Sequence, residues 1–311
     1  MKKNIVPNAH PLATLLRRLN KFCSKILVYG RMIKFEHTIF ALPFALASLL
    51  LAHRENPVEP RLVFWIIMAM IWARSAAMGF NRLVDARWDG KNPRTAGREI
   101  PAGNISRRDS ALFVLICSLL FVLSAASISR ICFWFSFPVL FLLCVYSYTK
   151  RFTWLSHLFL GFVQALVPLG VWLAVTGGFS LKIAAMSLTL GTYIAGFDLL
   201  YACQDVEFDR REGLYSMPAN LGIERSIAIS AFLHIITFIS LASLYWIFDL
   251  SPFYFFFAAV IGILLIVEHR LVKPNDLSKI NIAFFHVNSI ISVLLFAALM
   301  TEELVRRIHL P

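Results

Sequence analysis

Nine long apolar stretches restrict what this 311-residue chain can fold into more than any other feature of its sequence. A helix needs roughly 20 mostly apolar residues to cross the hydrocarbon core of a bilayer, and each stretch comes close to that length. They occupy residues 38–53, 61–82, 110–129, 131–149, 155–176, 181–204, 225–247, 252–269 and 281–304. Hydrophobic residues make up 59% of the chain, which is more than a soluble domain of this size can bury.

The backbone of a segment that crosses a membrane must satisfy its hydrogen bonds inside the protein, which leaves helices and closed barrels. Barrel strands would read as segments of about ten residues with alternating apolar and polar positions. The sequence lacks that alternation. We therefore predict an all-α, polytopic membrane protein with about nine transmembrane helices.

The first 34 residues carry eight Lys and Arg residues together with apolar residues at helical spacing. This pattern is typical of a basic amphipathic helix that lies on the membrane surface, and a disordered basic tail is the alternative. We expect residues 1–34 to form such a segment and residues 35–311 to form the transmembrane domain. No short apolar run with a cleavage site opens the chain, so we expect no cleaved signal peptide.

The net charge of +12 follows the membrane topology instead of marking a nucleic-acid partner. If the N-terminus is cytoplasmic, the N-terminal segment and alternate loops hold 23 of the 30 Lys and Arg residues. Cytoplasmic loops of membrane proteins carry such an excess. The sequence thus predicts a multi-pass protein of a bacterial-type inner membrane, with a cytoplasmic N-terminus and no nucleic-acid partner.

Two polar islands, residues 81–103 and 198–216, close apolar spans on the cytoplasmic side. Each contains a pair of aspartates four residues apart, and these are Asp85 with Asp89 and Asp205 with Asp209. Residues at this spacing share a helix face, where like charges repel unless a cation lies between them. Mg²⁺ prefers oxygen ligands and commonly binds one or two carboxylates plus substrate phosphates.

The islands therefore predict two Mg²⁺ ions on a diphosphate. The alternative is that these aspartates are solvated loop residues balanced by arginines. Two matched pairs among only 18 acidic residues make that alternative much weaker. Asp198 adds support because an ionisable group inside a span is costly and usually functional.

Basic side chains around the first pair favour a diphosphate over a bare metal site, since they can neutralise a departing leaving group. They are Arg87, Lys91, Arg94 and Arg98. Lys150 and Arg151 end the fourth span on the same side, where ordinary topology charges are an equally good explanation.

Together the islands resemble the signature motifs of the UbiA superfamily of intramembrane prenyltransferases. The first matches Asn-x-x-x-Asp-x-x-x-Asp, and the second matches Asp-x-x-x-Asp followed by Gly-x-x-Ser. The likeness extends to Arg94-Thr95, Arg98, Pro101, Lys150-Arg151, Tyr201-Ala202, Gln204-Asp205 and the approach to the first span at Arg31-Met32-Ile33-Lys34. With the nine expected spans, it covers nearly the whole chain.

The resemblance implies a fold of nine helices around a central cavity that opens sideways to lipid, beneath a cytoplasmic cap. It implies that one Mg²⁺ is held by Asp85 and Asp89 and the other by Asp205 and Asp209. The implied diphosphate-binding residues are Asn81, which would support the first cluster, with Arg94, Lys150, Arg151 and Lys34. Tyr146 would lie near the reacting carbon, and Asp198 would orient the acceptor or the second cluster.

Within the superfamily the chain looks most like the 4-hydroxybenzoate polyprenyltransferases of ubiquinone and menaquinone synthesis. The expected substrates are a polyprenyl diphosphate and a hydroxylated aromatic carboxylic acid, joined at a ring carbon within the lipid bilayer. One departure is Arg82, which stands where the best-known members have an acidic residue after the motif asparagine. A bacterial subgroup with this variant is associated with menaquinone, so 1,4-dihydroxy-6-naphthoate is the alternative acceptor.

Other polar residues inside the spans leave two further possibilities open. Arg74 lies two helical turns before Asn81, so it could bind the acceptor carboxylate or form a salt bridge with Asp198. A cation-coupled transporter would also explain intramembrane charges, but not two matched carboxylate pairs. Interhelical hydrogen bonds are the expected role of Gln164, His234, His286 and Asn288.

Overall fold

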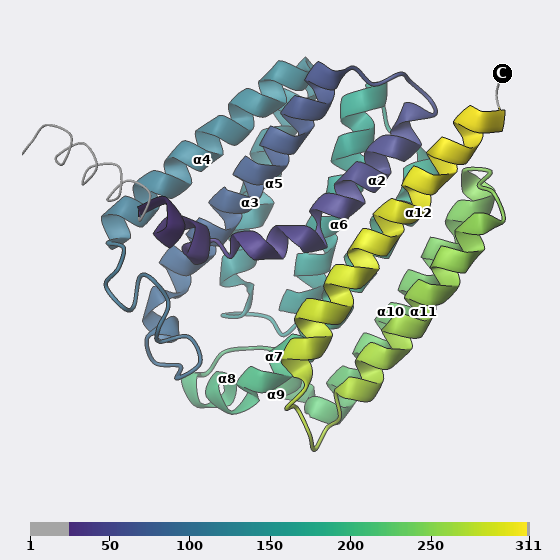
Figure 1. The fold of residues 1–311 in the computed structure, drawn as a ribbon. Helices are drawn as coiled ribbons and strands as arrows, with labels where there is room; N and C mark the ends of the chain where they lie inside the picture. The colour runs from purple at the N-terminus through teal and green to yellow at the C-terminus, as the bar shows by residue number, and fades with distance from the viewer. Residues whose placement is uncertain (1–24, 310–311) are drawn as a thin grey trace, which may run out of the picture.

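The computed structural model describes residues 25–309. All the long elements in this range are helices, and the range contains no β-strand (Figure 1). The amphipathic helix predicted in the N-terminal segment falls mainly on residues 1–24, outside the described residues. Residues 25–32 are helical. The proposed boundary between an N-terminal segment and a transmembrane domain therefore stays a prediction.

Eight helices of the described range are long and apolar enough to cross a membrane. They are α3 (Pro60–Asp89), α4 (Arg107–Ile128), α5 (Arg130–Thr149), α6 (Ser156–Thr176), α7 (Ala184–Ala202), α10 (Ile223–Ile247), α11 (Phe253–Leu271) and α12 (Asn288–His309). This confirms the all-α, polytopic membrane class.

The first of the nine predicted spans is shorter than expected. It forms a 3₁₀ turn, η1 (Phe35–Phe40), and a 12-residue helix, α2 (Leu42–His53). At 1.5 Å per residue α2 is about 18 Å long, whereas the hydrocarbon core is about 30 Å thick. The chain before α2 runs across the bundle in Figure 1. Pro43 lies in the first turn of α2, a position where proline favours the start of a helix.

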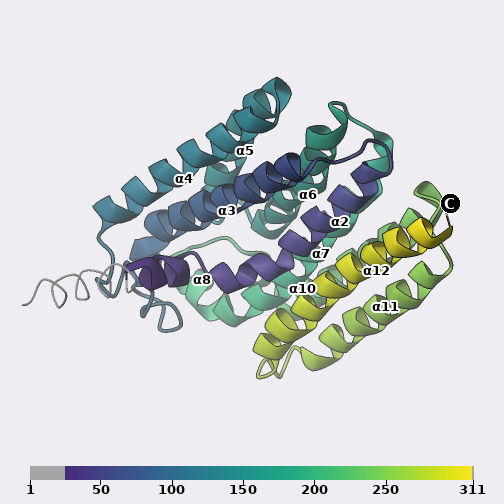
Figure 2. The same ribbon diagram turned by 45° about the horizontal axis from the view of Figure 1, so that its top comes forward.

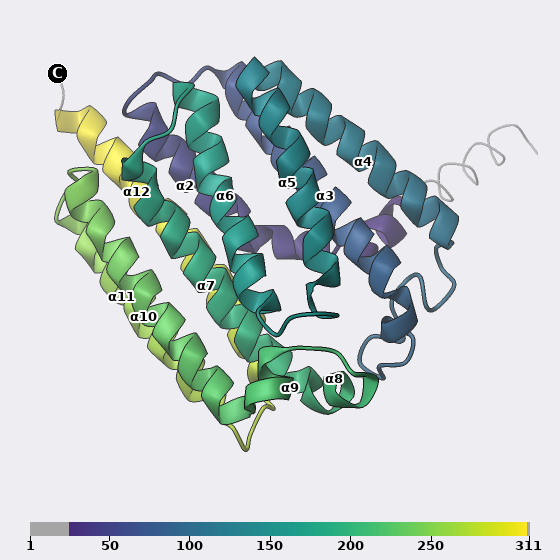
Figure 3. The same ribbon diagram turned by 180° about the vertical axis from the view of Figure 1, so that it is seen from behind.

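The helices form two groups that share one polar end. Helices α3, α4 and α5 pack on one another and form the first group. The second group contains α6, α7, α10, α11 and α12, and α2 lies between α6 and α12 (Figures 1 and 2). The short helices α8 (Val206–Glu212) and α9 (Met217–Leu221) lie at the same end as the loops that follow α3 and α5 (Figure 3). Both polar islands therefore end up at one end of the bundle.

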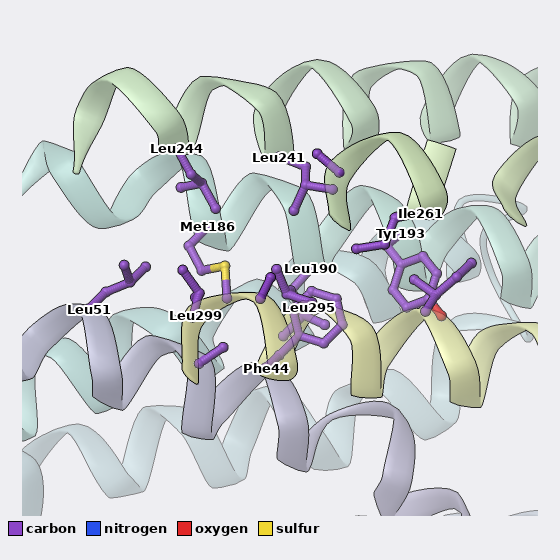
Figure 4. Packing of buried hydrophobic residues seen from close by; sticks show 14 of the residues in the cluster. Phe44, Leu51, Met186, Leu190, Tyr193, Leu241, Leu244, Ile261, Leu295 and Leu299 are labelled. Atoms are coloured by element: carbon purple, nitrogen blue, oxygen red, sulfur yellow. The ribbon is translucent and has the colours of Figure 1, made fainter. Parts of the chain in front are cut away.

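A large apolar core fixes α7, which carries the second polar island at its end. Tyr193 is fully buried and stacks on Phe44 of α2, with ring centroids 5.5 Å apart (Figure 4). Its hydroxyl donates to the backbone oxygen of Asn288 in α12 at 2.9 Å. Leu190 of the same helix is buried among side chains from α2, α10 and α12. Helix α7 is thus held from several sides at once.

Two of the polar residues inside the spans make the interhelical bonds predicted for them. Asn288 donates to Glu268 of α11 at 2.9 Å. The ring of His234 bonds to His269 at 2.9 Å and lies against α7 at Gly196, where an added Cβ would be 2.3 Å from its Nε2. Neither His234 nor Asn288 lines the cavity described below.

Helices α6 and α7 approach each other through glycine. A Cβ on Gly161 would lie 2.3 Å from the backbone oxygen of Gly191 and 2.8 Å from the Cβ of Ala195. Small residues at such crossings let membrane helices pack closely without a hydrophobic driving force. This contact sets the distance between α6, which contributes to the site, and α7.

We expect Gly161→Ala to lower the thermal unfolding temperature of the detergent-purified protein. The new methyl group overpacks the crossing, and overpacking typically costs about 1–3 kcal/mol. Gly170→Ala on the same helix is the matched control, because nothing lies within 4 Å of its added Cβ. It should leave stability unchanged or raise it by up to about 1 kcal/mol through helix propensity. Equal unfolding temperatures for the two variants would contradict the close crossing.

Candidate active site

The two aspartate pairs face one cavity at the polar end of the bundle. Asp85 and Asp89 occupy the last turns of α3, while Asp205 follows α7 in η3 (Cys203–Asp205) and Asp209 lies in α8. The cavity is lined by Asn81, Arg82, Asp85, Trp88, Asp89, Asn92, Arg94, Thr95, Arg98, Tyr146, Ser147, Lys150, Arg151, His157, Asp198, Tyr201, Ala202, Asp205, Phe208, Asp209 and Leu214.

The structure brings together ten of the eleven site residues predicted from sequence. These are Asn81, Asp85, Asp89, Arg94, Tyr146, Lys150, Arg151, Asp198, Asp205 and Asp209. Lys34 is not among the lining residues and precedes η1 in a left-handed conformation, with φ of 51°. Proximity does not test the individual roles, which remain predictions.

Asp85 is held by two neighbours. The side-chain amide of Asn81 donates to its Oδ2 at 2.9 Å, and the guanidinium of Arg151 lies 3.3 Å from its Oδ1. Arg151 also contacts two rings, with its guanidinium carbon 4.3 Å from the centroid of Trp88 and 4.6 Å from that of Tyr148. These cation–π contacts help to hold the guanidinium beside the first aspartate pair.

Asp89 is buried and pairs with Arg98 from the loop after α3, at 2.6 Å between Nη1 and Oδ1. The hydroxyl of Thr95 donates to the backbone oxygen of Asp89 at 3.0 Å, which folds the loop back over the helix end. The second carboxylate oxygen, Oδ2, is buried without a hydrogen-bond partner in the described structure. An unpaired buried carboxylate oxygen calls for a ligand, because leaving it without one is costly.

Asp205 joins the second island to the loop of the first. Arg94 binds both of its oxygens, with Nε 2.9 Å from Oδ1 and Nη2 on Oδ2, and the amide of Asn92 donates to Oδ1 at 3.0 Å. Arg94 also reaches the hydroxyl of Tyr201 at 3.2 Å. Two-pronged arginine–carboxylate pairs are both strong and directional. The loop after α3 is therefore clamped onto the end of α7.

Asp209 is almost fully buried, and the amine of Lys150 lies 3.7 Å from its Oδ2. That distance allows an ion pair but not a hydrogen bond, so Oδ2 of Asp209 has no hydrogen-bond partner. Burial opposes the charge of Lys150, but nearby carboxylates, Asp209 foremost, outweigh it and raise the pKa of this amine. Lys150 is therefore fully charged at neutral pH.

The four carboxylates each have their own cation, and each pair contributes one buried oxygen without a hydrogen bond, on Asp89 and Asp209. Such oxygens suit a hard divalent cation. No three metal-ligating side chains converge anywhere within residues 25–309. Two carboxylates completed by phosphate oxygens are nevertheless the usual arrangement for Mg²⁺, so the donor set fits this ion when a diphosphate is present.

Two residues of the cavity have no site role predicted from the sequence. His157 lies in the first turn of α6, and its Nδ1 lies 2.6 Å from Oδ2 of Asp198. A lone histidine next to an apolar span gives no pattern that could reveal this partner 41 residues away. Arg82 is buried against the cavity, where its Nε donates to the backbone oxygen of Met32 at 3.2 Å.

Two basic residues expected near the carboxylates lie elsewhere. Arg87 is exposed, and Lys91 pairs with Glu212 on the surface. Neither lines the cavity.

The chain is similar to known proteins over most of its length. A model described as the UbiA prenyltransferase family matches residues 41–290. The chain is 30% identical over 283 residues to the 4-hydroxybenzoate octaprenyltransferase of Histophilus somni (strain 2336), covering 85% of this chain and 93% of the relative.

Solved structures show the same fold. The apo structure of a UbiA homologue from Aeropyrum pernix K1 matches with a TM-score of 0.78 at 28% identity, over 86% of this chain and 98% of that chain. A UbiA homologue from Archaeoglobus fulgidus, bound to GPP and Mg²⁺, matches with a TM-score of 0.64 at 19% identity, over 88% of this chain and 99% of that chain.

The clamp between Arg94 and Asp205 predicts that Arg94→Ala loosens the loop of residues 90–106. Hydrogen–deuterium exchange of its backbone amides should speed up by about tenfold, as expected for one partly exposed, charged hydrogen-bond pair. Lys91→Ala is the control from the same loop, because its pair with Glu212 is solvent-exposed and contributes little. Identical exchange in the two variants would show that the clamp does not hold the loop.

Proposed function

This chain belongs to the UbiA prenyltransferase family, and from that premise we propose that it transfers a polyprenyl group from polyprenyl diphosphate to a ring carbon of a hydroxylated aromatic acid. One observation carries the proposal. Two carboxylate pairs and four cations from separate segments face a single cavity at the polar end of a membrane bundle. That combination suits a diphosphate whose hydrocarbon tail lies in the membrane.

The residues that would hold Mg²⁺ are Asp85 and Asp89 for one ion and Asp205 and Asp209 for the other. Bound there, Mg²⁺ would supply Lewis-acid polarisation of the diphosphate oxygens. The buried, unpaired oxygens of Asp89 and Asp209 support this assignment. So does the Archaeoglobus fulgidus homologue of the same fold, whose structure holds GPP and Mg²⁺.

The cations of the site would bind the diphosphate itself. Arg94, Lys150 and Arg151 each pair with a cavity carboxylate. With those carboxylates committed to the metal, the three cations would contact phosphate oxygens, and Asn81 would keep Asp85 in place. Charged donors aimed at a leaving group stabilise the negative charge that develops on it. For Lys34 the same role rests on the sequence resemblance alone.

Bond breaking and bond making then follow from where these groups lie. The C1–O bond of the prenyl diphosphate breaks, and its electron pair leaves with the diphosphate. The ring carbon next to a phenolic hydroxyl donates an electron pair to C1, and its hydrogen is lost as a proton to an oxygen of the departing diphosphate. Tyr146 and Tyr201 line the cavity and can stabilise positive charge on the prenyl group. Water would trap the cation, so the bound substrates themselves would have to displace it from the reacting carbon.

For the acceptor we favour the 4-hydroxybenzoate type, within ubiquinone or menaquinone biosynthesis. The Histophilus somni relative, a 4-hydroxybenzoate octaprenyltransferase, supports this choice. Arg82 next to the motif asparagine favours 1,4-dihydroxy-6-naphthoate as the second candidate. The protein would work in the inner membrane of a bacterial-type cell, with its N-terminus in the cytoplasm. A cation-coupled transporter does not account for the family or for the cavity.

We expect Asp85→Asn and Asp205→Asn each to lower turnover at least about 100-fold, since each removes charge that would hold the metal and stabilise the leaving group. Transfer of a labelled prenyl diphosphate to 4-hydroxybenzoate by purified protein measures this. Wild-type turnover should stop on chelation with EDTA and return with Mg²⁺. The control is Glu207→Gln, an exposed acid of the same island that lies outside the cavity. Retained activity in both aspartate variants would overturn the proposal.

A competition assay decides between the two acceptors. With 4-hydroxybenzoate and 1,4-dihydroxy-6-naphthoate at equal concentration, we expect prenylated 4-hydroxybenzoate to dominate, as read by mass spectrometry of the products. A dominant naphthoate product would reassign the acceptor while leaving the prenyl-transfer chemistry intact. No product from either acid would refute aromatic prenylation itself.

A further inference from the structure

Helix α12 is preceded by a turn of π-helix, η4 (Ile282–Val287), which holds more residues per turn than an α-helix. Such turns are rare in proteins and occur frequently at functional sites. The residues of η4 do not line the cavity. The turn nevertheless lies one aromatic contact away from it, because Phe284 of η4 packs on the cavity residue Tyr201. What holds this turn in shape therefore bears on the wall of the cavity.

Asn288 fixes the π-turn with both its backbone and its side chain. Its backbone N–H donates to the backbone oxygen of Phe285. Its side-chain amide donates to the backbone oxygens of Ala283 and Phe284, at 3.1 Å and 3.2 Å. One residue thus binds three successive backbone oxygens of the turn, and holds the turn from its C-terminal end.

Asn288 is itself held by two other helices. Its Nδ2 donates to Oε1 of Glu268 in α11 at 2.9 Å, and its backbone oxygen accepts the hydroxyl of Tyr193 in α7 at the same distance. Asn288 and Tyr193 are fully buried, and Glu268 is 1% exposed. Polar groups this deep in an apolar bundle are costly unless they are hydrogen-bonded. Here their hydrogen bonds converge on the residue that fixes the π-turn.

Phe284 connects the turn to the site. Its side chain is buried, and its ring lies 4.1 Å from that of Tyr201, centroid to centroid, with 31° between the two planes. The rings of Phe40 and Phe197 also contact it, with centroids 5.4 Å and 5.3 Å away. Aromatic pairs favour particular offsets and angles. A shift of the π-turn would therefore change the position of Tyr201.

Tyr201 in turn contacts the cation that clamps the second motif. Its hydroxyl accepts a hydrogen bond from Nη1 of Arg94 at 3.2 Å, and its ring centroid lies 5.3 Å from the same guanidinium. Arg94 binds both carboxylate oxygens of Asp205. A continuous series of contacts therefore connects Asn288 to Arg94 through the two rings that lie between them.

We infer that Asn288, held by Glu268, is a positioning residue of the active site: it fixes the π-turn so that the ring of Phe284 keeps Tyr201 against Arg94. Asn288 does not line the cavity, so it acts only through these rings. A displaced guanidinium would stabilise the leaving diphosphate less well. This effect on turnover rests on the proposed function, whereas the effect on the position of Arg94 does not.

Hydrogen–deuterium exchange of the detergent-purified protein tests the positioning without any substrate. Asn288→Leu keeps a side chain of similar size but removes the amide. Backbone amides of residues 90–106 should then exchange about threefold faster than in the wild type, because Arg94 loses part of its support. Tyr201→Leu removes both contacts to Arg94 and should accelerate exchange at least as much. His286→Ala, at an exposed position of the same turn, should leave exchange unchanged.

A double-mutant cycle separates positioning from general damage to the bundle. If Asn288 acts through Tyr201, adding Asn288→Leu to Tyr201→Leu should not accelerate exchange of the loop any further. A further acceleration of about threefold in the double variant would overturn the inference, and so would wild-type exchange of the loop in Asn288→Leu alone. If Asn288→Leu does not fold, Phe284→Leu takes its place in the same cycle, and unchanged exchange of the loop in that variant would overturn the inference too.

Turnover of geranyl diphosphate and 4-hydroxybenzoate with Mg²⁺ gives a second readout. In Asn288→Leu kcat should fall about three- to tenfold while the KM for the aromatic acid changes less than about twofold. Glu268→Gln keeps an acceptor for the amide of Asn288 and should retain nearly the full kcat, whereas Glu268→Leu removes the acceptor and should lower kcat. Equal kcat in the two Glu268 variants, or a loss in Asn288→Leu confined to KM, would rule out the positioning role. A wild-type protein that prenylates nothing refutes the proposed function instead, and the exchange experiment alone then decides the positioning.

Discussion

Neutralising closely spaced carboxylates at the edge of a membrane is the constraint on which the rest of the structure depends. Four aspartates face one cavity, and each is held by its own cation. Two of these cations, Arg94 and Arg98, lie in the loop after α3, and the other two, Lys150 and Arg151, follow α5. The contact between Arg94 and Asp205 ties the first motif's loop to the second motif. Ion pairs thus connect the end of α3, the end of α7 and the segment after α5 at the cavity.

The apolar bundle makes that arrangement rigid on one side. Helix α7 is enclosed by α2, α6, α10 and α12, with Tyr193 bonded across to α12 and Gly161 opposite Gly191. Asp198 and Asp205 therefore emerge from a fixed helix, whereas Asp89 leads into a loop held by polar contacts. Under the proposed function this division suits a site that binds and releases a charged diphosphate, because polar contacts of the loop could then change without disturbing the core.

Much of this could be predicted from the sequence, since membrane spans need long apolar runs and paired aspartates need helical spacing. Ten of the eleven expected site residues do line one cavity. What the pattern could not reveal depends on contacts between distant segments. The bond between His157 and Asp198 joins α6 to α7, and Arg82 looked like a family variant until burial showed its position. The shortness of α2 was hidden as well, because an apolar run continues through η1 while the helix does not.

Charge balance connects the proposed acceptor to the rest of the site. The cavity is lined by five Lys and Arg residues and five aspartates, so the protein alone is neutral there when His157 is uncharged. A prenyl diphosphate brings about three negative charges, and two Mg²⁺ ions bring four positive ones. The filled site would then keep one positive charge, which a buried environment disfavours. Under the proposed function, an acceptor with a carboxylate would remove that charge and a neutral phenol would not, so the charges that line the cavity favour an aromatic acid.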